Sequence, residues 1–106
     1  MGIFDFLRSP DMNQGVKEWK NTQGSVLLDV RTIEEYRQGH VPGGINIPLD
    51  ELNKVSSKVP KKDTPLFVHC LSGGRSSQAV HILRQMGYKT VKNIGGINRY
   101  HGKLEV

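Results

Sequence analysis

The segment LFVHCLSGGRS, residues 66–76, decides the fold. Its first five residues form a continuous apolar run of the kind that is buried on both faces of a parallel sheet. Gly73 and Gly74 then allow a tight turn, and a helix can begin at about Arg75. A buried strand, a glycine turn and a helix in this order are typical of an α/β protein.

The same alternation of strands and helices extends to both sides of this segment. We expect strands at about 25–30, 45–47, 66–70 and 89–94, and helices at about 11–21, 32–39, 50–59 and 75–86. Thr32 caps the second helix, with Glu35 in the capping-box position. In the last helix, one apolar stripe is predicted for Ala79, Ile82, Leu83 and Met86. This order predicts a parallel sheet covered on both faces, with ligands bound beyond the carboxyl ends of its strands.

Cys70, the single cysteine of the 106 residues, would lie at that edge of the sheet. The two glycines after it let successive backbone N–H groups point at one centre and form an anion nest. The N-terminus of the following helix adds a partial positive charge, and Arg75 adds a full one. These groups favour the thiolate over the thiol. We therefore predict an activated nucleophile rather than the inert buried residue that a lone cysteine usually is.

The reaction class depends on what surrounds this nucleophile. A cysteine hydrolase would need a histidine base directed at the sulfur. His69 is adjacent, but successive residues of a strand face opposite sides, and His40, His81 and His101 are scattered. A phosphatase is the stronger alternative, because tyrosine phosphatases also have a His-Cys…Arg-Ser loop. Those enzymes place five residues between Cys and Arg, whereas this chain places four, and the smaller ring suits a single sulfur atom better than a phosphate.

The net charge of +5 is divided unevenly along the chain. Residues 1–53 contain five Lys and Arg against eight Asp and Glu, whereas residues 54–106 contain ten against two. Such segregation attracts anions to one part of a surface, although a solvated basic face gives the same pattern. The lysines of the second half have no interleaved aromatic residues, so we expect no nucleic-acid partner.

Three blocks of sequence, over about residues 8–102, resemble the rhodanese family of sulfurtransferases in order and spacing. The first block comprises DVR (residues 29–31), the following EEY and the run GHVPGGINIP (39–48). The second, CLSGGRS (70–76), resembles the active-site loop of the family. The third, GGINRY (95–100), has Tyr100 where tryptophan is usual.

The resemblance implies a three-layer fold whose central parallel sheet has about five strands, one more than the apolar segments predict. It also implies that the Cys70 thiolate takes a sulfane sulfur from thiosulfate or a persulfide and gives it to a thiol or cyanide. The residues that would bind the substrate are Leu71, Ser72, Gly73, Gly74, Arg75 and Ser76. A buried polar network of Asp29, Arg31 and His40 would support the loop, and such a network needs internal hydrogen-bond partners.

The partners that the resemblance implies are a small anionic sulfur donor and a thiol acceptor, either a small molecule or a thioredoxin-like protein. No cofactor and no metal are expected. Leu71 stands where many relatives have a polar or basic residue, so the mouth of the pocket should be more apolar. No second cysteine can resolve a persulfide, so an external thiol must do so. The alternative function is a sulfur-relay module that loads sulfur within a partner complex but turns over poorly when free.

We expect residues 1–7 to form an apolar tail and residues 8–106 to form the rhodanese-like domain. The opening apolar stretch is short and interrupted by Asp5, which is not typical of a secretory signal. No segment approaches the roughly 20 apolar residues that cross a bilayer. We therefore expect a cytoplasmic domain with no membrane partner. One cysteine also forms neither an internal disulfide nor a cysteine-built zinc site.

Overall fold

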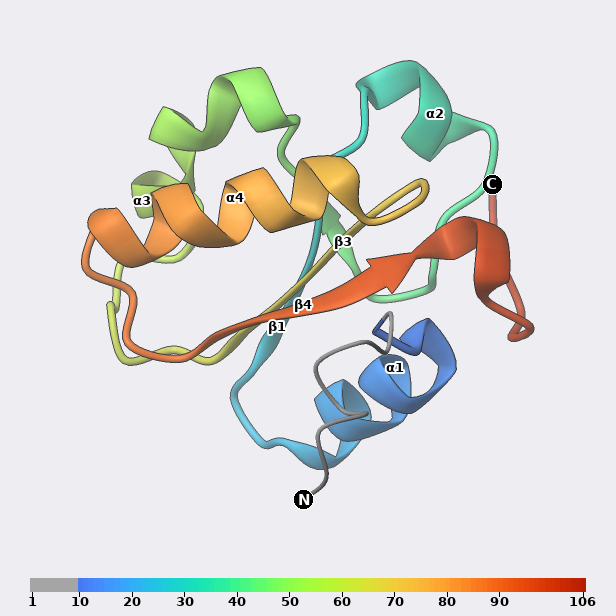
Figure 1. Cartoon of the computed structure of the whole chain (residues 1–106), viewed down its shortest axis with the longest axis horizontal. Coiled ribbons are helices and arrows are strands. Elements are labelled where there is room, and N and C mark those ends of the chain that lie inside the picture. The colour runs from blue at the N-terminus through green and yellow to red at the C-terminus, as the bar shows by residue number, and fades with distance from the viewer. Residues whose placement is uncertain (1–9) are drawn as a thin grey trace, which may run out of the picture.

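The computed structural model describes residues 10–106, so the expected apolar tail of residues 1–7 lies outside the described residues. Figure 1 shows the arrangement of its helices and strands. In chain order these are α1 (Met12–Asn21), β1 (Val26–Asp29), α2 (Ile33–Arg37), β2 (Ile45–Asn46), the 3-10 helix η2 (Leu49–Lys54), α3 (Val55–Lys58), β3 (Leu66–Cys70), α4 (Gly74–Gln85), β4 (Val91–Gly96) and the 3-10 helix η3 (Ile97–Arg99).

The strands form one parallel sheet in the order β2-β1-β3-β4. Helix α1 covers one face, and α3 and α4 cover the other, which confirms the three-layer α/β fold (Figure 1). The expectation of a fifth strand is wrong for the described residues, which form four. The C-terminal segment adds no strand to this sheet, and it forms an isolated antiparallel bridge between His40 and Glu105.

Alternation along the central strand β3 divides the core in two. Leu66, Val68 and Cys70 belong to the cluster on the α3 and α4 side, together with Leu83. Phe67 belongs to the cluster on the α1 side. The side chain of Cys70 therefore points to the face that α4 covers.

Two helices differ from the sequence-based expectation. The helix expected at 50–59 is a 3-10 helix followed by one turn of α-helix, with a non-helical residue at Glu51. In α4, Ile82 is exposed and Val80 is buried, so the predicted apolar stripe is wrong at these positions. Because α4 packs with Ser76 against the end of the sheet, its buried series runs Ser76, Ala79, Val80 and Leu83.

Strand β4 contains a bulge where it reaches the cysteine loop. Val68 pairs with Asn93 and His69 pairs with Gly95, so Ile94 is the extra residue. Gly95 has φ +99°, and a Cβ there would lie 2.8 Å from the carbonyl oxygen of Pro10. The bulge thus requires a glycine, and it leaves Asn93 on the α4 side of the strand.

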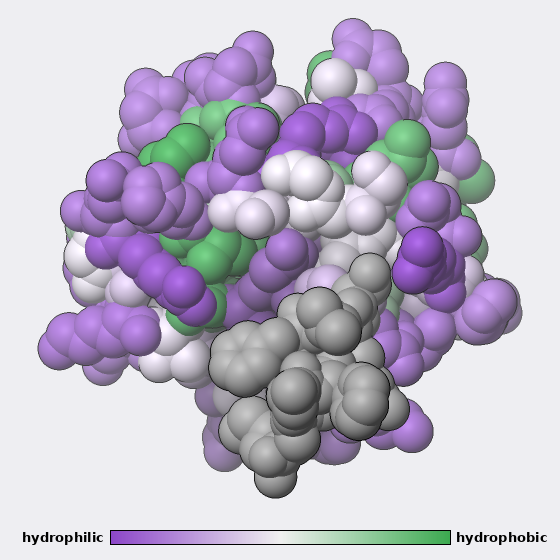
Figure 2. Space-filling view, in the orientation of Figure 1, coloured by the Kyte–Doolittle hydropathy of each residue, from purple (hydrophilic) through white to green (hydrophobic). Residues whose placement is uncertain are grey.

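The longest of the described helices, α4, has 12 residues, and none of the helices in residues 10–106 can cross a bilayer. The face drawn in Figure 2 is mainly hydrophilic, with only small, separate apolar areas.

Candidate active site

Cys70 ends β3, and its sulfur lies inside the turn that leads to α4. The backbone N–H of Gly73 donates a hydrogen bond to the sulfur at 3.0 Å. Gly73 has φ +110° and is the N-cap of α4, and no side chain caps this helix. The Cys70 sulfur thus accepts from this N-cap amide and, in the first turn of α4, from the amide of Ser76. Cys70 as a whole is only 1% exposed, so a reactant must reach the sulfur through the loop.

The environment of the sulfur favours its ionised form. Burial alone would raise the pKa of the Cys70 thiol, but hydrogen bonds from the hydroxyl and amide of Ser76 and from the amides of Gly73 and Ser72 outweigh it, so that the pKa lies below its ordinary value. A lowered pKa increases the thiolate fraction at neutral pH, and the thiolate is the nucleophilic form. This agrees with the predicted amide nest.

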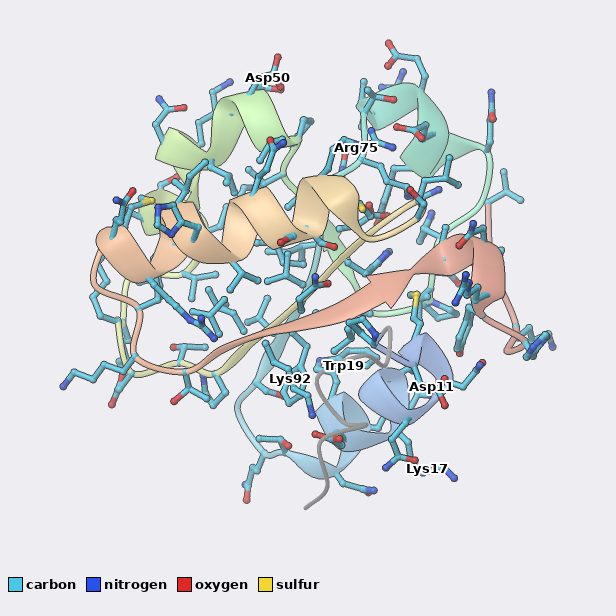
Figure 3. The ribbon with its side chains drawn as sticks, viewed as in Figure 1. Asp11, Lys17, Trp19, Asp50, Arg75 and Lys92 are labelled. Atoms are coloured by element: carbon cyan, nitrogen blue, oxygen red, sulfur yellow. The ribbon has the colours of Figure 1, made fainter. Side chains whose placement is uncertain are left out.

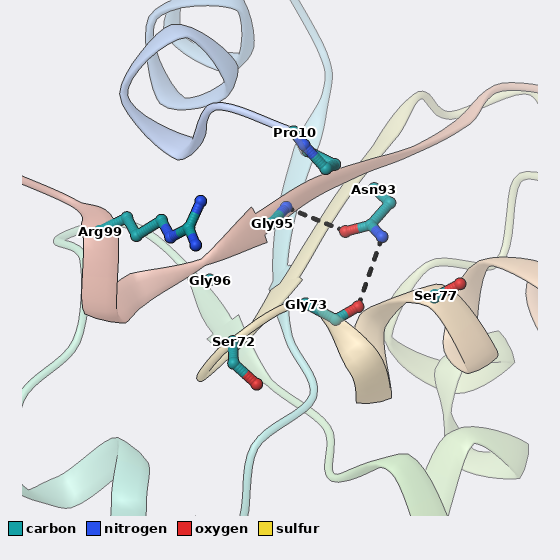
Figure 4. Close-up of a pocket in the computed structure, with 8 residues that line it drawn as sticks. All are labelled: Pro10, Ser72, Gly73, Ser77, Asn93, Gly95, Gly96 and Arg99. Atoms are coloured by element: carbon teal, nitrogen blue, oxygen red, sulfur yellow. Dashed lines mark hydrogen bonds between the residues drawn. The ribbon is translucent and has the colours of Figure 1, made fainter. Parts of the chain in front are cut away.

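The buried Ser76 and the half-buried Asn93 lie beneath the loop, and sequence reasoning missed Asn93. The Ser76 hydroxyl lies 3.4 Å from the Cys70 sulfur, 2.8 Å from Oδ1 of Asn93 and 3.0 Å from the carbonyl oxygen of Gly73. Asn93 Oδ1 also accepts from the N–H of Gly95 at 2.9 Å, which fixes the orientation of the amide (Figure 4). The missed signal was a polar residue within the segment expected as the last strand, next to the apolar Ile94.

Two hollows flank the loop. The first, of about 290 Å³, is drawn in Figure 4. Ser72, Gly73 and Asn93 line it, and the Arg99 side chain extends into it towards Gly95. In the described structure Cys70 is not among its lining residues, so this hollow adjoins the outer side of the loop.

The second hollow, of about 320 Å³, lies between α2 and the loop. Leu71 from the loop and Glu35 from α2 both line it, together with Ile97 and Leu104. Leu71 is 43% exposed, and its place at the mouth of the pocket stays a prediction. Its carbonyl oxygen accepts from the N–H of Asn98 at 3.1 Å, which ties the loop to η3.

Arg75 lies at the start of α4, beside α2 (Figure 3). Its terminal nitrogens donate to the two carboxylate oxygens of Glu35 at 2.6 and 2.9 Å. This ion pair raises the pKa of Arg75 and lowers that of Glu35 to about 2. Stabilisation of the sulfur by Arg75 stays a prediction, because the hydrogen bonds of the guanidinium go to Glu35.

Asp29 and Arg31 form a buried ion pair that is bonded to α2 and to the residues after it. The Nη2 of Arg31 lies 2.7 Å from Oδ2 of Asp29, and both side chains are almost fully buried. Arg31 also donates to the carbonyl oxygens of Glu35, at 3.3 Å, and Gly39, at 2.9 Å. The pair therefore braces the helix that carries the partner of Arg75.

The histidines do not face the sulfur. His69 is buried on the opposite side of β3, 3.8 Å from Asp29, and burial lowers its pKa. His40 stacks on Tyr36, with ring centroids 3.9 Å apart, and its Nε2 lies 3.4 Å from Glu105. The structure thus places His40 apart from the pair of Asp29 and Arg31, with which it was expected to form one network. Among residues 10–106, no three His, Cys, Asp or Glu side chains form a group that could hold a metal ion.

Comparison of the sequence with models of protein families leads to the same family as the geometry of the loop. The model of the rhodanese-like domain matches residues 12–103. The chain therefore belongs to the rhodanese-like domain family, whose homologues include proteins named sulfurtransferases.

Two relatives differ in what their names describe. The thiosulfate sulfurtransferase PspE of Escherichia coli K12 is 46% identical over 71 residues, which is 66% of this chain and 68% of PspE. The putative sulfur carrier protein YrkF of Bacillus subtilis 168 is 39% identical over 80 residues, which is 74% of this chain but only 43% of YrkF.

Solved structures agree with the fold. A rhodanese with anions from E. coli is 40% identical with a TM-score of 0.71, and the match covers 76% of this chain and 96% of that one. The protein SSP1007 of Staphylococcus saprophyticus is 26% identical with a TM-score of 0.78, and the match covers 93% of this chain and 99% of that one.

Proposed function

We propose that the protein is an enzyme that transfers sulfane sulfur through a persulfide on Cys70. The observation that carries the proposal is the geometry around the sulfur. The Gly73 amide and the Ser76 hydroxyl lie within hydrogen-bonding distance of it, at 3.0 and 3.4 Å. Hydrogen-bond donors that stabilise a negative charge on the sulfur prepare the thiolate to attack a molecule that supplies sulfane sulfur. They also stabilise the charged persulfide that results.

The proposed reaction has two displacement steps on sulfur. In the first, the Cys70 thiolate attacks the sulfane sulfur of the donor, the donor S–S bond breaks, and its electron pair leaves with sulfite from thiosulfate or with a thiolate from a persulfide. In the second, an acceptor thiolate or cyanide attacks the outer sulfur of Cys70–S–S⁻, and the electron pair of that S–S bond returns to Cys70. No oxidant or reductant is consumed.

The remaining loop residues have supporting roles in this proposal. Gly73 and Gly74 allow the turn that brings the amides to the sulfur, and Ser72 contributes another amide. Leu71 shapes the apolar mouth through which donor and acceptor pass. Asp29 and Arg31 hold α2 against the loop. His40 stabilises the C-terminal segment through Glu105.

The test is the mass of the intact protein after incubation with thiosulfate or with a persulfide of a small thiol. We expect the addition of one sulfur atom, its removal by cyanide or excess thiol, and its absence in Cys70→Ser. A wild-type protein that stays unmodified with both donors would overturn the proposal.

A sulfur-relay module is the second candidate. The exposure of only 1% at Cys70 favours it, because a buried sulfur reacts slowly with free donors and acceptors. Similarity to a putative sulfur carrier protein points the same way. Steady-state assays with thiosulfate and cyanide separate the two functions. An enzyme turns over many times, whereas a relay module loads one sulfur and releases it slowly to free acceptors.

A further inference from the structure

A carboxylate lies beside the cysteine loop, in the hollow that Leu71 also lines. Glu35 binds both terminal nitrogens of Arg75. The same carboxylate accepts hydrogen bonds from the backbone N–H of Thr32, at 3.0 Å, and from its hydroxyl, at 3.1 Å, as part of the capping box of α2. The helix to which Glu35 belongs therefore fixes its position beside the loop.

Glu35 carries its negative charge throughout the neutral pH range. The hydrogen bond from Arg75 is the main cause that lowers its pKa to about 2, against the smaller opposing effect of burial. The positive charge of Arg75 is thus matched by a permanent negative charge.

The hollow beside the loop contains no unmatched positive charge among the described residues. Glu35 and Arg31 are the charged side chains that line it. Arg31 is paired with Asp29, and Glu35 is paired with Arg75. His69 lies on the other side of β3 with a lowered pKa, so it adds no charge at neutral pH. The Arg99 side chain extends into the other hollow (Figure 4).

We propose that Glu35 is a specificity-determining residue, which makes this site favour sulfane-sulfur donors with one negative charge, such as thiosulfonate or persulfide anions, over dianions such as thiosulfate. The inference rests on the proposed function. A donor must approach an anionic sulfur, and Glu35 cancels the charge of Arg75 that would otherwise offset the repulsion. Because Coulomb repulsion is proportional to the charge of the donor, a dianion is disfavoured twice as strongly in free energy as a monoanion.

Thiosulfate and methanethiosulfonate form a matched pair of donors for the test. In the second compound a methyl group replaces one charged oxygen, so the donor carries one negative charge instead of two. The Cys70 thiolate attacks the sulfane sulfur of either compound, and the leaving group is sulfite or methanesulfinate. Each reaction leaves the same persulfide on Cys70, and cyanide serves as the acceptor in both assays.

The variant to compare is Glu35→Gln, because glutamine keeps the capping box but removes the charge. We expect kcat/KM to rise roughly tenfold for thiosulfate and roughly threefold for methanethiosulfonate, as the charges of two and one require. The ratio of the two kcat/KM values cancels the intrinsic reactivity of the donors, and it should shift about threefold towards thiosulfate. A merely structural role of Glu35 would change both values by the same factor.

The matched control is Glu34→Gln, which makes the same charge change on the adjacent, exposed residue of α2. We expect it to leave the donor ratio at the wild-type value. An unchanged ratio in Glu35→Gln, or an equal shift in both variants, would overturn the inference. If neither donor adds sulfur to Cys70 in the wild-type protein, the proposed function itself fails, which is a different result.

A second measurement needs no variant. Added salt screens the repulsion between the site and the donor. We therefore expect kcat/KM of the wild-type protein to rise with ionic strength more steeply for thiosulfate than for methanethiosulfonate. A fall in the thiosulfate value with added salt would contradict the inference, because it would mean that net attraction by the basic chain outweighs the effect of Glu35.

Discussion

Ser76 Oγ and Asn93 Oδ1 lie 2.8 Å apart, directly beneath the sulfur of Cys70. Ser76 has one hydroxyl hydrogen, and Asn93 Oδ1 can only accept it. In the thiol form, the S–H donates to Ser76 and the Ser76 hydroxyl donates to Asn93. In the thiolate form, the charged sulfur competes for the same hydrogen, because charge-assisted hydrogen bonds are the stronger ones.

This competition predicts a non-additive pair of substitutions. Ser76→Ala should raise the pKa of Cys70 by about 1 unit, since a hydrogen bond to a charged group is lost. Asn93→Ala should lower this pKa while Ser76 is present and leave it unchanged in the Ser76→Ala background. The measurement is the pH dependence of the alkylation rate of Cys70. If Asn93→Ala raises the pKa in both backgrounds, Asn93 only holds the loop in shape.

The pair of Glu35 and Arg75 predicts a loss of stability in acid. Because the pKa of Glu35 is lowered from 4.5 to about 2, its stabilising effect is complete above pH 4.5 and is lost as the pH falls towards 2. Urea unfolding should show that the wild-type protein loses about 2 kcal/mol more than Glu35→Gln over this range, after allowance for partial solvent screening. Glu34→Gln should follow the wild-type profile, and a Glu35→Gln profile that also does so would contradict this assignment.

Loss of one partner from the buried pair of Asp29 and Arg31 should destabilise the fold far more than loss of one partner from a surface pair. Arg31→Ala leaves the Asp29 carboxylate buried without its partner, and we expect a loss of about 3 to 5 kcal/mol in the free energy of unfolding. The control is Lys92→Ala, which breaks the exposed pair with Glu18 and should cost at most about 1 kcal/mol. Equal losses in the two variants would mean that burial does not determine the effect.

The bulge in β4 predicts that alanine substitution costs different amounts of stability at two glycines that share a positive φ. Gly95 has φ +99°, and Gly24 has φ +78°. An added Cβ would meet the Pro10 carbonyl at 2.8 Å in Gly95→Ala, whereas nothing lies within 4 Å in Gly24→Ala. We expect about 1 kcal/mol of backbone strain in Gly24→Ala and at least twice this loss in Gly95→Ala, measured by thermal unfolding. A smaller loss in Gly95→Ala would show that α1 shifts freely.

Local patterns in the sequence predicted the elements that depend on neighbouring residues. The capping box of Thr32 and Glu35 is present, because both of its partners lie within one turn of α2. The turn after Cys70 also has the expected form, since Gly73 adopts a positive φ and directs its amide at the sulfur.

Contacts between distant segments could not be read from the same patterns. Glu35 and Arg75 are 40 positions apart, so the capping residue gave no sign of its second partner. Asn93 reaches Ser76 only because a bulge in β4 changes the register beside Cys70. The buried face of α4 also differs from the expected one, because Ser76 makes its hydrogen bonds at the end of the sheet and the residues three, four and seven positions later share its face, which leaves Ile82 exposed.

The use of the Cys70 sulfur as the acceptor for the Gly73 amide links chemistry to folding. No N-cap side chain closes the first turn of α4, and the amide of its N-cap residue donates to an atom whose charge and size change during each cycle. Hydrogen exchange of the Gly73 amide should therefore report the state of the thiol. Protection of this amide from exchange should be highest when the sulfur is anionic and lowest after alkylation. The exchange rate of one backbone proton would then report the chemical state of Cys70.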